Sequence, residues 1–142
     1  MRRSRTLVDA YGLVSFLIGG PGAAEVRAIL RSGEAVVATG NLAETLDVAE
    51  RIHGLPIQRA AEILDPLFEA VIDVVPLDSS LARRAAEIRA REYHRERRPI
   101  SLADSILIAT AETVGRLATA DPHVLAIARE RGIEAVDLIP RG

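Results

Sequence analysis

The sequence predicts an α/β sandwich, in which helices flank a parallel sheet of about five strands. Short apolar runs alternate along the chain with longer segments whose apolar residues recur every three or four positions. The connections between them are too short to reverse the direction of a strand, which favours parallel strands. A chain of 142 residues is expected to fold as one domain over residues 1–142, with a substantial core.

Each element is placed by its apolar spacing and by the residues that interrupt it. Strands are expected at residues 6–8, 35–38, 72–75, 117–119 and 135–139. Helices are expected at residues 10–18, 23–32, 41–53, 57–71, 79–98 and 101–114, and from 122 onward. Pro66 is expected to kink or split its helix after Asp65, because proline has no N–H to donate. Pro99 is expected to end the long helix at residue 98, since the residue before a proline avoids helical angles.

The run at residues 100–111 predicts the central helix, because it is apolar on nearly all sides. Its first turn carries one acid, Asp104. Ser101 is a favourable N-cap, and a carboxylate three residues later can accept a hydrogen bond from the Ser101 N–H. A capping box is therefore the simplest explanation of Asp104.

Acids also stand at three other predicted element starts, where each can be explained singly as a cap or a first-turn acid. They are Asp9, Glu44 and Asp121. In a parallel sheet, however, all strand-to-helix turns share one edge, where ligands collect. Capping does not explain why four acids would converge there.

A hard divalent cation suits a site made only of carboxylates. Carboxylates about 5 Å apart repel by roughly 3 kcal/mol per pair at a dielectric near 20, so they must protonate or bind a cation. Mg²⁺ or Mn²⁺ takes carboxylate oxygens and keeps water ligands free for a phosphate substrate. Because a metal-bound water is deprotonated near neutral pH and can attack a phosphodiester, the four acids favour phosphoryl chemistry.

Composition excludes several other classes of function. The chain has no cysteine, which rules out disulfides, thiol catalysis and cysteine-ligated zinc. All 18 basic residues are arginine, which excludes Walker A loops and lysine chemistry. The net charge of −2 offers no global attraction for a polyanion, so polyanion binding requires a local arginine patch.

One arginine patch lies in the far half of the predicted helix 79–98. It comprises Arg89, Arg91, Arg95, Arg97 and Arg98. A solvated face explains it through pairing of Glu87 with Arg91 and through the preference of cations for a helix C-terminus. Because the patch leads directly into the Asp104 helix, its last three arginines are also candidates for holding phosphates.

The N-terminus resembles a signal peptide only weakly. Residues 1–5 carry three arginines and residues 13–18 are apolar, but Asp9 interrupts the run and a glycine-rich segment follows early. No stretch approaches the length of a membrane span. We expect a cytoplasmic protein that makes no membrane contact.

Four motifs resemble, in order and spacing, those of the PIN-domain ribonucleases. They are Leu7-Val8-Asp9, Leu42-Ala43-Glu44, the run from Ser101 to Ala111, and Thr119-Ala120-Asp121. The length and the segment Val75-Pro76-Leu77-Asp78 are most similar to the VapC-type toxins of toxin-antitoxin pairs. The resemblance implies a PIN-like three-layer sandwich with strand order 3-2-1-4-5. It also implies a metal-dependent endoribonuclease that leaves a 5′-phosphate and a 3′-hydroxyl.

The resemblance further implies roles for single residues and for partners. Asp9, Glu44, Asp104 and Asp121 would ligate Mg²⁺ or Mn²⁺, directly or through water. Thr119 matches a hydroxyl residue that contacts the ligands rather than the metal, although an ordinary strand threonine explains it as well. The partners would be an RNA substrate, a small antitoxin that occupies the active groove, and a second copy in a homodimer.

Tyr11 departs from the family pattern, which usually has a small Ser, Thr or Asn two residues after the first aspartate. A phenol can donate a hydrogen bond beside the ligands, but it cannot reproduce the position of a serine hydroxyl. An aromatic residue that packs on the core at a helix start explains Tyr11 equally well. The alternative function is therefore a PIN-like module that binds RNA or an antitoxin and has a weakened metal site.

Other readings of the acids and the histidines have less support. A phosphate-accepting signalling domain needs a lysine that this chain lacks, and a phosphatase of the haloacid dehalogenase type needs a second aspartate where Tyr11 stands. His53 and His94 are expected at the surface. His123 is expected to be a solvated residue of the first helical turn, with an approach to the metal edge as the alternative.

Overall fold

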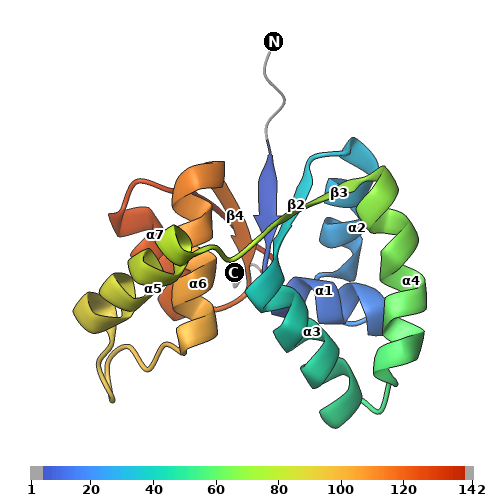
Figure 1. Ribbon diagram of the computed structural model, residues 1–142, viewed down its shortest axis with the longest axis horizontal. Coiled ribbons are helices and arrows are strands. Elements are labelled where there is room, and N and C mark those ends of the chain that lie inside the picture. The colour runs from blue at the N-terminus through green and yellow to red at the C-terminus, as the bar shows by residue number, and fades with distance from the viewer. Residues whose placement is uncertain (1–4, 140–142) are drawn as a thin grey trace.

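The computed structural model describes residues 5–139, and within them the chain forms a five-stranded parallel sheet (Figure 1). Its strand order, β3-β2-β1-β4-β5, confirms the order that the family resemblance implied. Every neighbouring pair is parallel. The strands are β1 (Thr6–Val8), β2 (Ala35–Ala38), β3 (Ile72–Val75), β4 (Arg116–Thr119) and β5 (Glu134–Asp137). The leader-like residues 1–4 lie outside the described residues.

Helices cover both faces of the sheet, which confirms the three-layer sandwich. In residues 5–139 they are α1 (Ala10–Ile18), α2 (Ala23–Ser32), α3 (Thr39–Arg51), α4 (Ile57–Ala70), α5 (Ser79–Glu92), α6 (Leu102–Val114) and α7 (Pro122–Glu130). One core cluster contains residues of α5, α6 and α7, and the other contains residues of α1 and α2, against which α4 packs. Leu7 belongs to the first cluster and its neighbour Val8 to the second. Both faces of β1 and β2 are therefore buried, which explains why these inner strands are almost entirely apolar and do not alternate.

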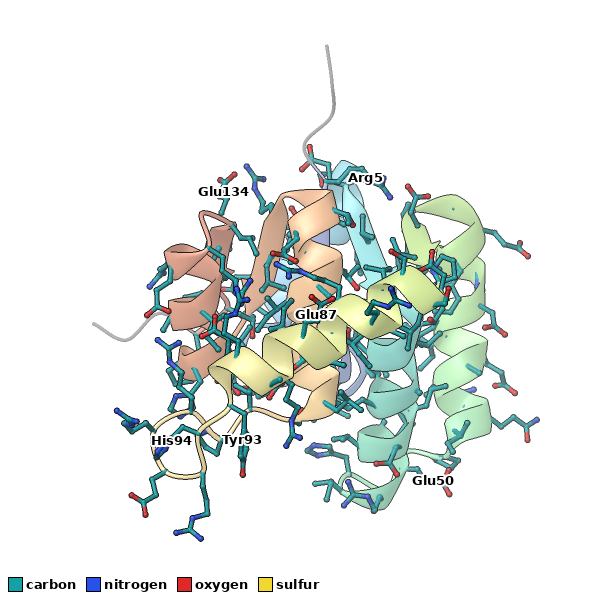
Figure 2. The ribbon with its side chains drawn as sticks, turned by 60° about the vertical axis from the view of Figure 1, so that its left-hand side comes forward. Arg5, Glu50, Glu87, Tyr93, His94 and Glu134 are labelled. Carbon is teal, nitrogen blue, oxygen red and sulfur yellow. The ribbon has the colours of Figure 1, made fainter. Side chains whose placement is uncertain are left out.

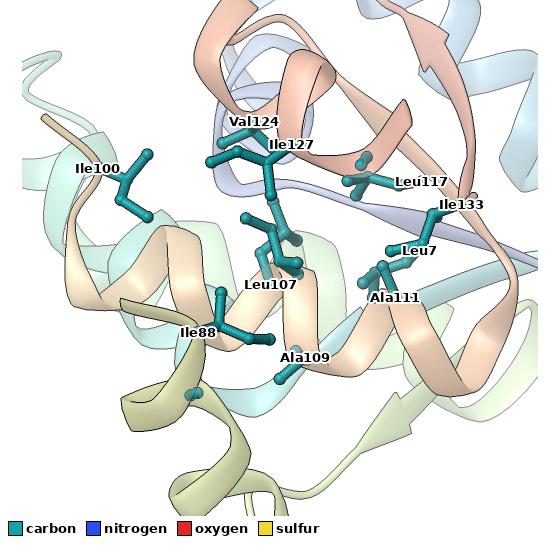
Figure 3. Packing of buried hydrophobic residues seen from close by; sticks show 14 of the residues in the cluster. Leu7, Ile88, Ile100, Leu107, Ala109, Ala111, Leu117, Val124, Ile127 and Ile133 are labelled. Carbon is teal, nitrogen blue, oxygen red and sulfur yellow. The ribbon is translucent and has the colours of Figure 1, made fainter. Parts of the chain in front are cut away.

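Helix α6 is the central helix expected from the apolar run (Figure 3). Its buried residues begin at Ser105 and include Leu107, which shares a core cluster with Leu7 and Ile127. The first turn is open to solvent, where Leu102 is 54% exposed. The body of the helix thus anchors it in the core, while its N-terminal end remains accessible.

The glycine-rich break separates α1 from α2 as expected. Gly19 ends α1 at a φ of 71° and Gly22 precedes α2 at a φ of 85°. Both values lie in the left-handed region, which glycine enters without steric cost.

In the part of the chain that the structure describes, no single helix is long and apolar enough to cross a membrane. The bent pair α1 and α2, which meet at 101°, satisfies that criterion only together.

Two helices differ from their predicted form. Helix α4 runs through Pro66 without a break, so the alternative of a split after Asp65 is wrong. Pro66 and Glu62, whose carbonyl loses its usual donor, lie on the exposed side, where water can replace that donor. Helix α5 ends at Glu92 rather than at residue 98. The cause is a hairpin turn in which the N–H groups of His94 and Arg98 each donate to the other's carbonyl, a pairing that the proline rule does not anticipate.

Candidate metal centre

Asp9 is placed by the end of β1 and the start of α1. Its N–H donates to the Ala118 carbonyl of β4 at 3.1 Å, so the residue is still held by the sheet. Its Oδ1 accepts from the Gly12 N–H at 2.7 Å, and Oδ2 accepts from the Thr119 hydroxyl at 2.6 Å. The residue is only 6% exposed. Asp9 is therefore both the N-cap of α1 and a buried carboxylate that is tied to a second strand.

Gly12 allows α1 to begin this close to the sheet. A Cβ at this position would lie 2.9 Å from Leu138 Cδ1 and from Val8 Cγ1, and 3.2 Å from Asp9 Oδ1. The first two distances are shorter than van der Waals contact, so a side chain would push α1 away from the strand. The absence of a side chain at Gly12 thus helps to position the first acid.

Thr119 links the first acid to the last. Its hydroxyl donates to Asp9 Oδ2 and accepts from the Asp121 N–H at 3.2 Å. Asp121 is the N-cap of α7, and its Oδ1 accepts from the N–H groups of His123 and Val124 at 2.8 and 3.2 Å. Thr119 is fully buried. This geometry favours the role that the family resemblance gave it over that of an ordinary strand threonine.

Asp104 forms the predicted capping box at the start of α6. The Ser101 N–H donates to Asp104 Oδ2 at 2.8 Å, and the Asp104 N–H donates to the Ser101 hydroxyl at 3.0 Å. The capping explanation is therefore correct for Asp104, as it is for Asp9 and Asp121. Glu44 is different, because it lies past the first turn of α3 and caps nothing.

Asn41 is a buried polar residue of this region that the sequence analysis did not single out. It is 1% exposed, and its Nδ2 donates to the Ala103 carbonyl of α6 at 3.2 Å. Its Oδ1 is buried without a partner among residues 5–139. Its position three residues before Glu44, on the same face of the predicted helix, is the signal that identifies it. Asn41 joins the helix of Glu44 to the helix of Asp104.

All four acids line one open pocket of about 570 Å³, together with Asn41 and Tyr11. Apolar residues form the rest of its wall: Val14, Ile18, Val48, Leu107 and Ile139. The capping explanation and the convergence of the acids thus hold at the same time. Tyr11 is 41% exposed at this pocket, so the suggestion that it packs on the core is wrong.

Burial makes the acids of the pocket difficult to ionise together. Burial raises the pKa of Asp9 from its ordinary 3.8 to about 6, against the lowering effect of the hydrogen bonds from Thr119, Gly12 and Ala120. Burial and the charge of Asp104 raise the pKa of Glu44. Burial also raises the pKa of Asp104, to which the charge of Asp121 adds. These directions are the ones expected where carboxylates share a buried cavity.

The donor chemistry of the pocket fits a hard cation. The pocket is lined by four carboxylates and by Asn41, whose amide oxygen has no partner within residues 5–139, and Mg²⁺ prefers oxygen ligands of these kinds. Ser15, Tyr11 and His53 also line the pocket. In the described residues no three acidic or histidine side chains are grouped closely enough to hold a metal ion. The carboxylates are not grouped more closely because three of them accept capping hydrogen bonds at the starts of their own helices. Each carboxylate oxygen has a further lone pair with which to accept a cation.

The positions of the arginines and histidines agree only in part with those predicted from the sequence. No arginine lines the pocket among the described residues. Arg98 pairs with Glu92 and Glu130, while Arg95 and Arg97 are exposed on the turn after α5. His53, expected only at the surface, is exposed and lines the pocket. His123 is half-buried, beside Asp121 in the chain.

The overall fold is similar to three solved structures. VapC20 from Mycobacterium tuberculosis, described as a toxin that cleaves the sarcin-ricin loop, has a TM-score of 0.69 at 16% identity, over 86% of this chain and 94% of that chain. DNA-bound VapBC from Salmonella typhimurium has a TM-score of 0.68 at 20% identity, over 96% of this chain and 99% of that chain. FitAB bound to a DNA fragment has a TM-score of 0.65 at 23% identity, over 96% and 97%. At these identities the likeness concerns the fold.

The sequence itself places the chain in a family. No curated protein sequence matches it. The family model of the PIN domain matches residues 6–130. This range contains the strands β1 to β4 and all four acids of the pocket. The chain therefore belongs to the PIN domain family.

Proposed function

We propose that this protein is a metal-dependent endoribonuclease and the toxin of a toxin-antitoxin pair. One observation carries the proposal, namely that four acids from separate segments of the chain, three of them at helix starts, line a single pocket. Membership of the PIN domain family and a fold shared with a toxin that cleaves the sarcin-ricin loop support it. Which RNA this chain cuts does not follow from the acids, because RNA is recognised by shape and by unstacked bases.

The residues that would hold Mg²⁺ or Mn²⁺ are Asp9, Glu44, Asp104 and Asp121. When bound, such an ion would supply positive charge to the scissile phosphate and would lower the pKa of the attacking water. Thr119 keeps Asp9 available as an ionised ligand, because its hydrogen bond lowers the pKa of that carboxyl. Asn41 holds α3 against α6, so that Glu44 and Asp104 remain in the same pocket.

The proposed partners follow from the same family. A small antitoxin that covers the pocket is the partner that the family resemblance implies, and the similar structures of VapBC and FitAB, each bound to DNA, support a partner of this kind. Two copies of the chain are expected to form a homodimer, and the cytoplasm is the expected site of action. Light scattering of the purified protein measures the dimer directly.

A binding module without catalysis is the second candidate, and two observations favour it. Three of the four carboxylates are turned toward their helix caps, and no three acidic or histidine side chains within residues 5–139 are grouped closely enough to hold a metal ion. Tyr11 also places a bulky phenol at the pocket, where the family usually has a small polar residue. Such a module would bind RNA or an antitoxin and leave RNA intact with either metal.

The deciding experiment is cleavage of total RNA by the purified protein without antitoxin, with Mg²⁺ or Mn²⁺ and with EDTA. Asp104→Asn is expected to reduce cleavage by about a hundredfold or more, because it removes a ligand charge while its amide oxygen still accepts the Ser101 N–H. Asp65→Asn, an exposed acid of α4, is the matched control and should cleave normally. Full activity of Asp104→Asn contradicts the metal site, and intact RNA with both metals favours the binding module.

A further inference from the structure

The turn between α5 and α6 is a rigid hairpin that presents arginines. The N–H groups of His94 and Arg98 donate to each other's carbonyls, at 3.0 and 2.9 Å. Inside the turn, His94 Nδ1 accepts from the N–H groups of Glu96 and Arg97, both at 3.1 Å. Figure 2 shows the turn projecting from the body of the molecule, with His94 within it. The backbone that carries Arg95 and Arg97 is thus held in place before any ligand arrives.

The base of the hairpin is fastened to the core. Arg98 pairs with Glu92 at 2.8 Å, and also with Glu130 of α7. Ile100 is 2% exposed, and its carbonyl accepts from Arg89 Nε at 3.3 Å. The charge of Arg98 is therefore balanced within the protein, which disfavours the phosphate-binding role that the sequence suggested for it.

Three further arginines of the patch, Arg91, Arg95 and Arg97, are available to an external anion. Arg91 and Arg97 make no ion pair within residues 5–139, and the expected pairing of Glu87 with Arg91 does not form. Arg95 approaches only Glu96, at 3.8 Å, with 85% and 76% of the two side chains exposed. A contact of that kind contributes little. The tip of the hairpin is thus a small surface of unbalanced positive charge.

Tyr93 adds an aromatic ring beside these charges. Tyr93 is 43% exposed, and Figure 2 shows its side chain directed away from α5. The Arg89 guanidinium lies 4.6 Å from the ring centroid. A ring supported by a cation on one side and open to solvent is the kind of surface on which the bases of single-stranded nucleic acid stack.

The hairpin leads directly into the helix that carries Asp104. From Arg97 to Ser101, the N-cap of α6, the chain can span at most about 14 Å. The pocket has four carboxylates and no arginine along its described wall. A strand whose phosphate enters the pocket therefore needs cations outside it to hold the neighbouring phosphates.

We propose that Tyr93, Arg95 and Arg97 form a contact surface for the single-stranded RNA that flanks the phosphate in the acid pocket. Arg95 and Arg97 bind phosphates, and Tyr93 stacks on a base. The assignment rests on the proposed ribonuclease function for the identity of the ligand. It predicts that the surface contributes to affinity for RNA without contributing to the chemistry.

The test measures binding of a short fluorescein-labelled single-stranded RNA of mixed sequence, by anisotropy in EDTA and in an Asp104→Asn background. Arg95→Gln/Arg97→Gln should weaken binding about tenfold at low salt and reduce the salt slope of log K by about 1.4, the value for two phosphate contacts. Arg95→Lys/Arg97→Lys should restore most of both. Tyr93→Ala should weaken binding by about tenfold and Tyr93→Phe should not, because only the former removes the stacking face.

The matched control is Arg27→Gln/Arg31→Gln, which removes two exposed arginines of α2 that also make no ion pair among the described residues. It should bind RNA as the parent does. If both double variants weaken RNA binding equally, the effect reflects only the net charge of the protein, and the proposal is overturned. RNA binding that is unchanged in the hairpin variants also overturns the proposal, even if these variants lose a protein partner that co-purifies with the wild-type protein.

The outcome is separable from that of the ribonuclease test. If wild-type protein cleaves RNA but the hairpin variants bind RNA normally, the contact surface is wrong and the proposed function stands. If wild-type protein leaves RNA intact while the hairpin variants lose binding, the surface is correct and the function is that of a binding module.

Discussion

Thr119 is the residue on which the arrangement of the acids most depends. Its hydroxyl donates a hydrogen bond to Asp9 and accepts one from the Asp121 N–H. Thr119 has no exposed surface. A buried hydrogen bond to a charged group contributes more than one between neutral groups. The side chain therefore both orients Asp9 and opposes the rise of its pKa that burial causes.

Thr119→Val removes the hydroxyl but keeps the shape of the side chain. We expect Mg²⁺ affinity at neutral pH to fall severalfold, because the pKa of Asp9 rises further and the ionised ligand becomes less favourable. The free energy of unfolding should fall by about 1–3 kcal/mol. Calorimetric titration with Mg²⁺ and urea unfolding measure the two effects.

The control for Thr119→Val is Thr110→Val. Thr110 is also buried, and its hydroxyl donates to the Ile106 carbonyl within α6 at 2.8 Å, away from the pocket. This variant should lose stability without losing affinity for Mg²⁺. Equal losses of metal affinity in the two variants would mean that Thr119 acts through stability alone.

At the scale of elements, an ion-pair network joins α5, α6 and α7. Glu92 of α5 pairs with Arg131 at 2.8 Å and with Arg98 at 2.8 Å. Glu112 of α6 pairs with Arg84 of α5 at 2.8 Å and with Arg131 at 3.5 Å. The side chains of Glu92 and Arg131 are only 15% and 13% exposed, so solvent screens this pair less than the surface pairs of the molecule.

Glu92→Gln should destabilise the protein by about 2 kcal/mol, because it leaves Arg131 and Arg98 partly buried without a shared counter-charge. The comparison is Glu62→Gln, which breaks the pair of Glu62 with Arg59, whose side chains are 55% and 68% exposed. That variant should change stability by less than about 0.5 kcal/mol. Urea unfolding at low and at high salt measures both, and a similar small effect in the two would show that the network contributes little.

At the scale of the whole molecule, the sheet gathers three chain-distant carboxylates whose burial is unfavourable for their charged forms. The ordinary pKa of Asp9 is 3.8 and its value in the folded protein is about 6, and burial raises the pKa of Glu44 and Asp104 in the same direction. In this interval the folded protein binds more protons than the unfolded chain. The contribution of these three carboxylates to the stability of the metal-free protein therefore decreases as the pH rises from about 4 to about 6.

A divalent cation should reverse this dependence, because it favours the ionised carboxylates. We expect Mg²⁺ or Mn²⁺ to raise the melting temperature little near pH 4 and by several degrees above pH 6. Melting curves across this range, with and without metal, measure the effect. Asp9→Asn should flatten the dependence of the metal-free protein, and an unchanged profile in that variant would assign the titration to other groups.

Most of the secondary structure and the helix capping could be predicted from the sequence. Strands β1, β2 and β3 have their predicted limits, and Ser101 with Asp104 forms the predicted capping box. Helix periodicity and capping depend on residues within one or two turns, which is why the sequence reveals them. The prediction of α5 was wrong beyond Glu92, because the turn is held by contacts with α7 through Arg98 and Glu130 that no local rule contains.

By itself, the sequence determined the α/β order, the acids at four element starts and the motifs of the PIN domain family. Only the tertiary structure decided that those acids line one pocket, that Asn41 joins two of their helices and that Tyr11 is open to solvent. The physical reason is the separation along the chain of the groups involved. Thr119 and Asp9 are 110 residues apart, and packing of β4 beside β1 brings them within a hydrogen bond of each other.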